Sequence, residues 1–211
     1  MHTVKILKVI PVTHTVKQFT VEKPAGYKFT PGQATEIAGH PFTFTSLNDW
    51  PDLQFTIKIY PVAQNPTHTG ITEKLGTLTA GDELLIGDPW GTIEYKGPGV
   101  FIAGGAGITP FIAIIRQLAK DEKLEGNMFI FSNKTKKDVI YEEELKKYFG
   151  NNLKLVFTQE GDGHVDKRYL EKNVKNFSQH FYVCGPKAMV AEINQTLESL
   201  GAQSDNLVFE R

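Results

Sequence analysis

Cysteine is almost absent from this sequence, in which Cys184 is the single cysteine among 211 residues. One thiol excludes a disulfide framework and any cysteine-ligated iron–sulfur cluster within the chain. The histidines outside every motif, His2, His14, His164 and His180, are scattered along the sequence. They form no ligand-spaced cluster, so we expect no metal site.

A surplus of charge and a long hydrophobic run are also missing. The formal net charge is −1, so nothing attracts the chain in general to nucleic acid or to an anionic membrane. The longest apolar tract contains glycines and a proline, and the first residues lack the apolar core of a signal peptide. We therefore expect a cytoplasmic monomer that does not insert into a membrane and binds no nucleic acid.

The two halves of the chain differ in their predicted elements. Residues 1–97 contain short alternating segments separated by Pro, Gly and Asn, which predict an antiparallel β-barrel domain. Residues 98–211 alternate strands with helices, which predicts an α/β domain with a doubly wound parallel sheet. The Gly/Pro joint Lys96–Gly99 marks the boundary between these two domains.

Each predicted element follows from the local pattern of apolar residues. The barrel strands are Val4–Ile10, Val16–Val21, Ala34–Ile37, Phe42–Ser46, Phe55–Tyr60 and Leu84–Ile86, with one short helix at Ile71–Leu75. The parallel strands are Val100–Ala103, Met128–Phe131, Leu153–Phe157, Phe181–Cys184 and Leu207–Phe209. The helices between them are Pro110–Lys120, Tyr141–Phe149, Lys167–Lys172 and Lys187–Leu200.

A glycine turn joins the first parallel strand to the first long helix. Glycines let the backbone approach a ligand closely, and a helix N-terminus offers free N–H groups to a phosphate. We interpret the turn as a dinucleotide cradle, although Pro110 replaces the last glycine of the G-x-G-x-x-G pattern and no carboxylate follows the next strand. A turn that serves only strand–helix packing is the alternative. The turn reads Gly104-Gly105-Ala106-Gly107-Ile108-Thr109-Pro110.

Three further stretches could carry chemistry, and each also has a plain structural interpretation. The stretch His40–Ser46 alternates Thr and Phe and is typical of a half-buried barrel strand. Thr69–Thr72 opens the short helix, where it could be a cap or an anion site. Cys184 ends a strand before Gly185-Pro186 and could be a small buried hydrophobe.

The order of these motifs is more specific than any one of them. A barrel with Pro-Phe-Thr-x-Thr-Ser, then Gly-x-Thr, then Gly-Gly-Ala-Gly-Ile-Thr-Pro, then Cys-Gly-Pro resembles the ferredoxin–NADP reductase superfamily. The resemblance covers nearly the whole chain and is closest to the short flavodoxin-reductase-like branch without an iron–sulfur domain. It implies that the barrel binds FAD and that the α/β domain binds NADH or NADPH. A hydride then passes from nicotinamide to flavin, and electrons leave to a separate acceptor.

The resemblance also implies which barrel residues hold FAD. Phe42 takes the place of the aromatic that stacks on the isoalloxazine ring, and Thr43 that of the hydroxyl that hydrogen-bonds the redox nitrogen, a catalytic position. His40 stands where the family has the arginine that pairs with the FAD diphosphate. The remaining residues implied in FAD binding are Pro41, Ile57, Lys58, Tyr60, Thr69, Gly70, Ile71 and Thr72.

On the nicotinamide side, the resemblance implies contacts from several strand ends. Thr109 matches the residue between nicotinamide and flavin, and Cys184 matches the catalytic cysteine near the reacting carbon. Glu210 resembles a C-terminal catalytic acid that some members place beside that cysteine. The other implied contacts are Gly104, Gly105, Ala106, Gly107, Ile108, Ser132, Asn133, Lys134, Gly185 and Pro186.

Two departures from the family pattern concern the flavin. Residues 1–97 contain no arginine, and His40, Lys58, His68 or Lys74 offers no bidentate fork for the diphosphate. Phe42 lacks the hydroxyl of the usual tyrosine. The choice of nicotinamide is open as well, since the lysines after the second parallel strand could attract a 2′-phosphate, but the segment contains no arginine and resembles NADH-using members. We favour NADH.

The sequence thus predicts an FAD-dependent NAD(P)H oxidoreductase that passes electrons to flavodoxin or ferredoxin, a haem protein or a small quinone. The alternative is a flavin-binding electron-relay or sensor subunit of a larger complex, without nicotinamide turnover of its own. A third interpretation is a structural protein in which neither the FAD site nor the nicotinamide site is functional.

Overall fold

The computed structural model describes residues 1–67, 69–91 and 93–209. The chain forms two compact units, one made of residues 1–92 and 109–117, the other of residues 93–108 and 118–211. The chain crosses between the units more than once, so the sequence-based domain boundary at residue 97 stays a prediction. No helix in the described residues is long and apolar enough to cross a membrane.

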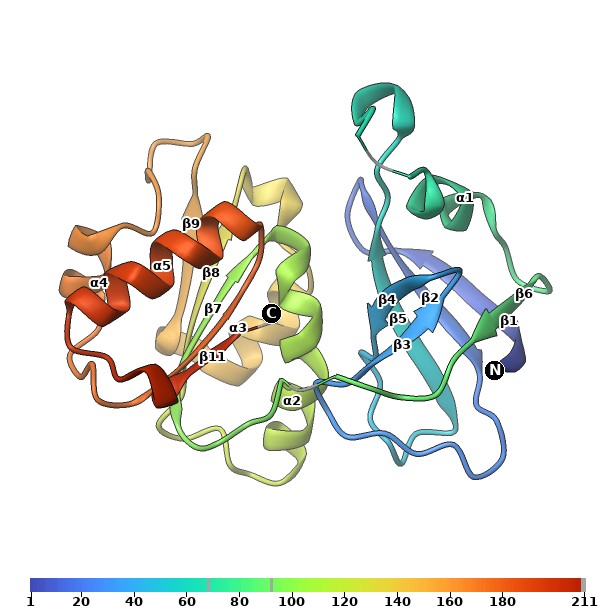
Figure 1. The fold of residues 1–211 in the computed structure, drawn as a ribbon, viewed down its shortest axis with the longest axis horizontal. Helices are drawn as coiled ribbons and strands as arrows, with labels where there is room; N and C mark the ends of the chain where they lie inside the picture. Colours follow the sequence, from blue (N-terminus) through green and yellow to red (C-terminus); the bar gives the residue numbers. More distant parts are fainter. Residues whose placement is uncertain (68, 92, 210–211) are drawn as a thin grey trace. The chain divides into compact units, whose positions relative to one another are not determined.

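The first unit is built on an antiparallel sheet (Figure 1). In the described part of the chain its six strands lie in the order β4-β3-β6-β1-β2-β5. The edge strands meet where Phe44 bridges Phe55 and the Thr45 N–H donates to the Gln54 carbonyl at 2.8 Å, which closes the sheet into a barrel. The elements are β1 (His2–Pro11), β2 (Val16–Glu22), β3 (Ala34–Ile37), β4 (His40–Thr43), β5 (Asp52–Lys58), β6 (Glu83–Ile86) and the helix α1 (Ile71–Thr77).

The strand predicted at Phe42–Ser46 is wrong in its bounds. The ladder of β4 with β3 covers His40–Thr43. Beyond it, the Phe44 N–H donates to the Gln33 carbonyl and the next residue pairs with Gln54 on β5. The segment therefore changes partners at Phe44. A local pattern of alternating residues could not reveal this change, because it depends on a strand ten residues further along the chain.

Aromatic side chains fill the barrel core. Phe44 stacks on Phe29 with ring centroids 4.3 Å apart and lies 5.3 Å from Phe55. Phe44 and Phe55 are completely buried, as is Phe19 on β2. Such pairs contribute beyond the area they bury, so this cluster is a main source of the barrel's stability.

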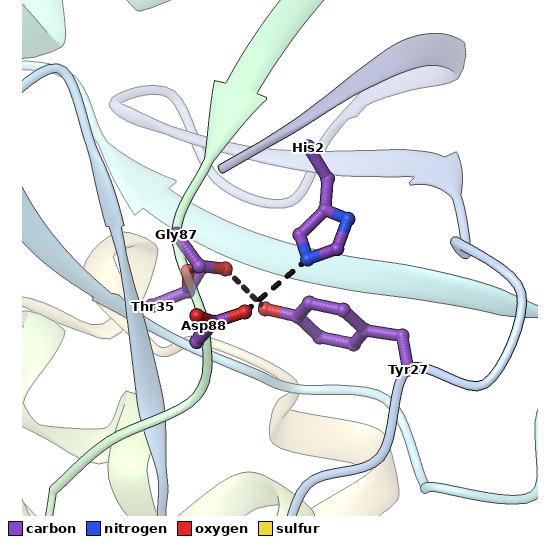
Figure 2. A network of polar contacts seen from close by, with 5 residues as sticks. All are labelled: His2, Tyr27, Thr35, Gly87 and Asp88. Carbon is purple, nitrogen blue, oxygen red and sulfur yellow. Dashed lines mark hydrogen bonds and ion pairs between the residues drawn. The ribbon is translucent and has the colours of Figure 1, made fainter.

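A polar network connects the first strand to the last strand of the barrel (Figure 2). The Tyr27 hydroxyl and the Thr35 hydroxyl both donate to the Gly87 carbonyl at 2.8 Å. His2 packs edge-on against the Tyr27 ring and lies 3.2 Å from the Asp88 carboxylate. Burial, and to a smaller extent Asp88, raises the pKa of Tyr27 above its ordinary value. The network fixes the connection that leaves β6.

The second unit contains a parallel sheet with the order β11-β10-β7-β8-β9 (Figure 1). The chain runs outward from β7 through β8 to β9 and then returns to β10 on the other side of β7. The topological switch point, where open parallel sheets bind ligands, therefore lies between β7 and β10. The strands are β7 (Gly99–Gly104), β8 (Met128–Asn133), β9 (Leu153–Phe157), β10 (His180–Cys184) and β11 (Leu207–Phe209). The helices of the α/β region are α2 (Thr109–Lys120), α3 (Glu142–Phe149), α4 (Lys167–Asn173) and α5 (Lys187–Ser199).

The parallel strands are apolar on both faces, as expected for a sheet covered on both sides. On one face, Ile102, Ile130 and Val183 pack with Leu170 of α4 and Ile193 of α5. On the other face, an aromatic stack begins with Phe101 and Tyr182, whose ring centroids are 4.6 Å apart. Together with the barrel, this sheet confirms the fold class that the sequence predicted.

The hydroxyl of Tyr182 anchors the joint before β7. It accepts hydrogen bonds from the N–H groups of Lys96 and Gly97, at 2.9 and 3.1 Å, and donates to the Gly97 carbonyl at 2.7 Å. Burial raises the pKa of this tyrosine, against the opposing effect of the two backbone donors. One buried side chain thus satisfies three polar groups of an irregular segment.

Candidate functional site

Two turns touch at the switch point of the parallel sheet. A Cβ added to Gly107 would lie 2.5 Å from the carbonyl oxygen of Cys184 and 2.6 Å from the Cα of Gly185. A Cβ at Gly104 would collide with the Sδ of Met189. Glycine is therefore required at Gly107, where it brings the predicted segments 104–108 and 184–186 into direct contact, whereas a Cβ at Gly104 would displace the flexible side chain of Met189.

Gly105 has a different role from its neighbours. Its φ is +53°, a left-handed conformation that other residues rarely adopt, and nothing lies within 4 Å of a Cβ built there. The turn therefore combines both interpretations of the sequence, because two of its glycines serve packing while the third leaves backbone open to a ligand.

Asn133, at the carboxyl end of β8, is a buried amide without partners. It is 4% exposed, and neither its Oδ1 nor its Nδ2 has a hydrogen bond. In the register of the parallel strands, Asn133 lies on the same face as Ala103 and Cys184. Leaving such a group unpaired costs about 1–3 kcal/mol. We therefore expect a polar ligand to form hydrogen bonds with the Asn133 amide.

The segment after β8 is held by two carboxylates. The Thr135 hydroxyl and N–H donate to Asp138 at 2.8 and 3.0 Å, which caps a short helical turn. The Lys136 N–H donates to the carboxylate of Glu160, 3.3 Å away in the loop after β9. Glu160 is not apparent from the sequence pattern, which places an acid after the second parallel strand, whereas Glu160 follows the third and pairing of β8 with β9 brings it here.

Three residues are implied on the nicotinamide side: Cys184, Glu210 and Thr109. Cys184 ends β10, is 6% exposed and forms no disulfide. Glu210 lies outside the described residues. Thr109 is the first residue of α2 and belongs to the first unit.

In the first unit, the implied FAD residues converge from β4, β5 and the start of α1. The Nε2 of His40 lies 3.4 Å from the hydroxyl of Thr69. The Tyr60 N–H donates to the Thr72 hydroxyl at 3.2 Å, and Lys58 lies over the Tyr60 ring, with Nζ 5.5 Å from the centroid. Burial raises the pKa of Tyr60. His40 and Thr69, 29 positions apart in the sequence, are thus neighbours at this edge of the barrel.

The other implied FAD residues vary in accessibility. Gly70 precedes α1 with a φ of +77°, and a Cβ there would lie 3.1 Å from Val62, so the turn requires glycine. Phe42 and Thr43 are partly exposed on β4, whereas the side chain of Ile57 is buried in the core. Only the backbone of Ile57 could therefore meet a cofactor. Pro41 is exposed and Ile71 is partly buried.

The fold and the site define a class: an antiparallel barrel joined to a parallel sheet that has a glycine turn at its switch point. Residues 101–195 match the family described as oxidoreductase NAD-binding domain. A ferredoxin NADP⁺ reductase from Neisseria gonorrhoeae, solved with bound FAD and NADP, aligns with a TM-score of 0.83 at 19% identity and covers 99% of this chain and 97% of its own. These findings confirm the sequence-based resemblance: residues 101–195 are similar to an oxidoreductase NAD-binding domain, and the chain shares the fold of this ferredoxin NADP⁺ reductase.

Curated relatives extend the similarity over most of the chain. The reductase component of propane 2-monooxygenase from Rhodococcus jostii is 23% identical over 98% of this chain and 62% of its own length. NADH-cytochrome b5 reductase 1 from Coccidioides immitis is 28% identical over 84% of this chain and 63% of its own length. The chain therefore spans less than two thirds of both relatives.

Proposed function

We propose that this chain is an FAD-dependent NAD(P)H oxidoreductase that delivers electrons to a separate acceptor. FAD, when bound, would take a hydride from the nicotinamide and release electrons singly or in pairs. The observation that carries the proposal is the buried, unpaired amide of Asn133 at the carboxyl end of β8, next to β7, on the same sheet face as Cys184 at the switch point.

The residues at the switch point fit a nicotinamide dinucleotide. The open backbone of Gly105 and the N–H groups that follow it would bind the diphosphate. Asn133 and Ser132 would take the adenosine side, where the amide can both donate to and accept from ribose hydroxyls. Cys184 would orient the nicotinamide, and Thr109 would help to position it.

The barrel residues fit FAD in the same sense. Phe42 would lie along the isoalloxazine ring, and Thr43 would donate a hydrogen bond to the flavin nitrogen that changes protonation. His40 and Thr69 lie 3.4 Å apart and would meet the diphosphate together. Lys58 would supply a positive charge, since the described part of the barrel strands contains no arginine.

Glu160 favours NADH as the preferred nucleotide. Its carboxylate is held beside the Lys136 N–H in the segment that follows β8, where the adenosine ribose would lie. A carboxylate there accepts hydrogen bonds from ribose hydroxyls and repels a 2′-phosphate. The exposed side chains of Lys134, Lys136 and Lys137 would instead attract a 2′-phosphate and so favour NADPH. Lysine is a weaker phosphate clamp than arginine, however, so the acid prevails.

The acceptor would be an electron-carrier protein or an oxygenase component, because one relative is named as the reductase component of propane 2-monooxygenase and another as a cytochrome b5 reductase. Visible spectra before and after anaerobic NADH test the proposal. A yellow protein that NADH bleaches supports it. A yellow protein that stays yellow would indicate a flavin relay, and a colourless protein that takes up no FAD would indicate a scaffold without function at either site.

A further inference from the structure

Arg116 is a buried cation on α2. It is not among the residues proposed to bind a cofactor, and it belongs to none of the sequence motifs. It lies on α2 directly after the apolar run Phe111–Ile115, and it is 9% exposed. Residues 109–117 of this helix belong to the first unit, with the barrel. Burying a guanidinium is costly unless its donors are satisfied, so its partners indicate what it holds in place.

Three of its partners come from neighbouring parts of the barrel. The Nη1 of Arg116 donates to the carbonyl of Thr45, in the segment that continues β4, and lies 3.3 Å from the Oε1 of Gln54 on β5. The guanidinium also lies over the Trp50 ring, with Cζ 5.4 Å from its centroid. Nη1 makes both hydrogen bonds while the flat guanidinium lies against the ring, a combination that a lysine ammonium reproduces only in part.

These contacts connect two residues that matter for hydride transfer. Thr45 is two residues after Thr43 in the same extended segment, so its carbonyl moves with that segment. Thr109 is seven residues before Arg116 on α2, which is about two helical turns and therefore the same helix face. Arg116 thus links the segment of Thr43, proposed to contact flavin, to the helix that begins with Thr109, proposed to contact nicotinamide.

We propose that Arg116 is a positioning residue for hydride transfer, which fixes the start of α2 relative to the segment that carries Thr43. The inference rests on the proposed function. It differs from a purely structural role in its consequence: loss of the fork should slow the chemical step while FAD and NADH still bind. Misplacement by about 1 Å can cost roughly a hundredfold in rate, even when it originates away from the reacting atoms.

The test uses Arg116→Met and Arg116→Lys, with Arg168→Met as the matched control because Arg168 is exposed on α4. Stopped-flow reduction of the FAD-loaded protein by NADH gives the limiting rate and its dependence on NADH. For Arg116→Met we expect a limiting rate about tenfold to a hundredfold lower, with FAD affinity and half-saturating NADH within about threefold, a factor worth ~0.7 kcal/mol. The lysine variant should recover part of the rate, and the control should match the wild type.

The other outcomes contradict either the positioning role of Arg116 or the proposed oxidoreductase function. If wild-type FAD is reduced and Arg116→Met is reduced as fast, the positioning role is wrong and the proposed function stands. If the variant loses FAD affinity or thermal stability while its limiting rate is unchanged, Arg116 is structural only. If NADH does not reduce the wild type, the proposed function fails and the inference with it. Should both Arg116 variants fail to fold, Gln54→Leu removes one acceptor of the guanidinium; an unchanged limiting rate there also overturns the proposal.

Discussion

Replacing His40 with arginine should tighten FAD binding. His40 lies on β4 with its Nε2 3.4 Å from the Thr69 hydroxyl, so one ring nitrogen already faces the turn before α1. A neutral imidazole donates one hydrogen bond only and carries no charge, whereas arginine offers a fork of donors with a permanent charge. The variant would restore the group that the superfamily resemblance leads one to expect at the FAD diphosphate.

The size of the gain follows from the number of contacts that change. A hydrogen bond to a charged group contributes about 1.5–3 kcal/mol, and ~1.4 kcal/mol is a tenfold change in affinity. His40→Arg should therefore improve FAD affinity about tenfold to a hundredfold. FMN has no second phosphate and no adenosine, so its affinity should change much less.

Fluorescence titration of the apoprotein with FAD and with FMN measures both constants. His14→Arg is the matched control, because it adds the same charge at an exposed position in the β1–β2 connection. A gain in FAD affinity below about threefold, or ~0.7 kcal/mol, or an equal gain for FMN and FAD would show that His40 is not a diphosphate ligand.

Three further changes probe the nucleotide side and the scaffold. Cys184→Ala should lower the limiting rate of flavin reduction by about tenfold or more and weaken NADH binding less than that; an unchanged limiting rate in stopped-flow experiments would remove Cys184 from the catalytic assignment. Glu160→Gln should raise kcat/KM for NADPH relative to NADH by about tenfold, because a like-charge repulsion is lost, and an unchanged ratio would place the ribose elsewhere. Tyr182→Phe should lower the free energy of unfolding by about 1–3 kcal/mol, because two backbone N–H groups lose their acceptor; urea unfolding measures this, and no change would contradict the anchoring role. The pKa of Tyr182 is higher in the folded than in the unfolded state, where it is near 10. The resulting stabilisation is fully present below the unfolded pKa and is lost as pH rises through the folded pKa. The wild type should therefore lose stability more steeply above about pH 10 than the variant.

The fold could be predicted from the sequence because its signals are local. Apolar runs that end at a glycine define β7 and β10, and the segment at Leu153–Phe157 forms β9 with the predicted bounds. The bounds of β5 differ from the predicted Phe55–Tyr60, and those of β4 differ because the chain exchanges β3 for β5 as its partner at Phe44. This change of partner depends on which strand closes the barrel, and the residues near Phe44 do not indicate it.

The candidate site could be predicted only in part, for the same reason. The turns at 104–108 and 184–186 were identifiable, because their glycines and proline are visible in the sequence. Three features depend on contacts between distant residues: the unpaired amide of Asn133, the acid Glu160 beside Lys136, and the partners of Arg116. For Arg116, a lone charge that ends an apolar helical run, seven residues after Thr109, was the signal that could have revealed it.

Anaerobic mixing of the FAD-loaded protein with NADH, and with NADH deuterated at the reacting carbon, tests whether the protein transfers a hydride from nicotinamide to flavin. We expect the visible flavin band to bleach far faster than that of free FAD and the deuterated nucleotide to react more slowly, because a hydride is transferred on the protein. A flavin that stays oxidised, or that bleaches no faster than free FAD, would contradict it.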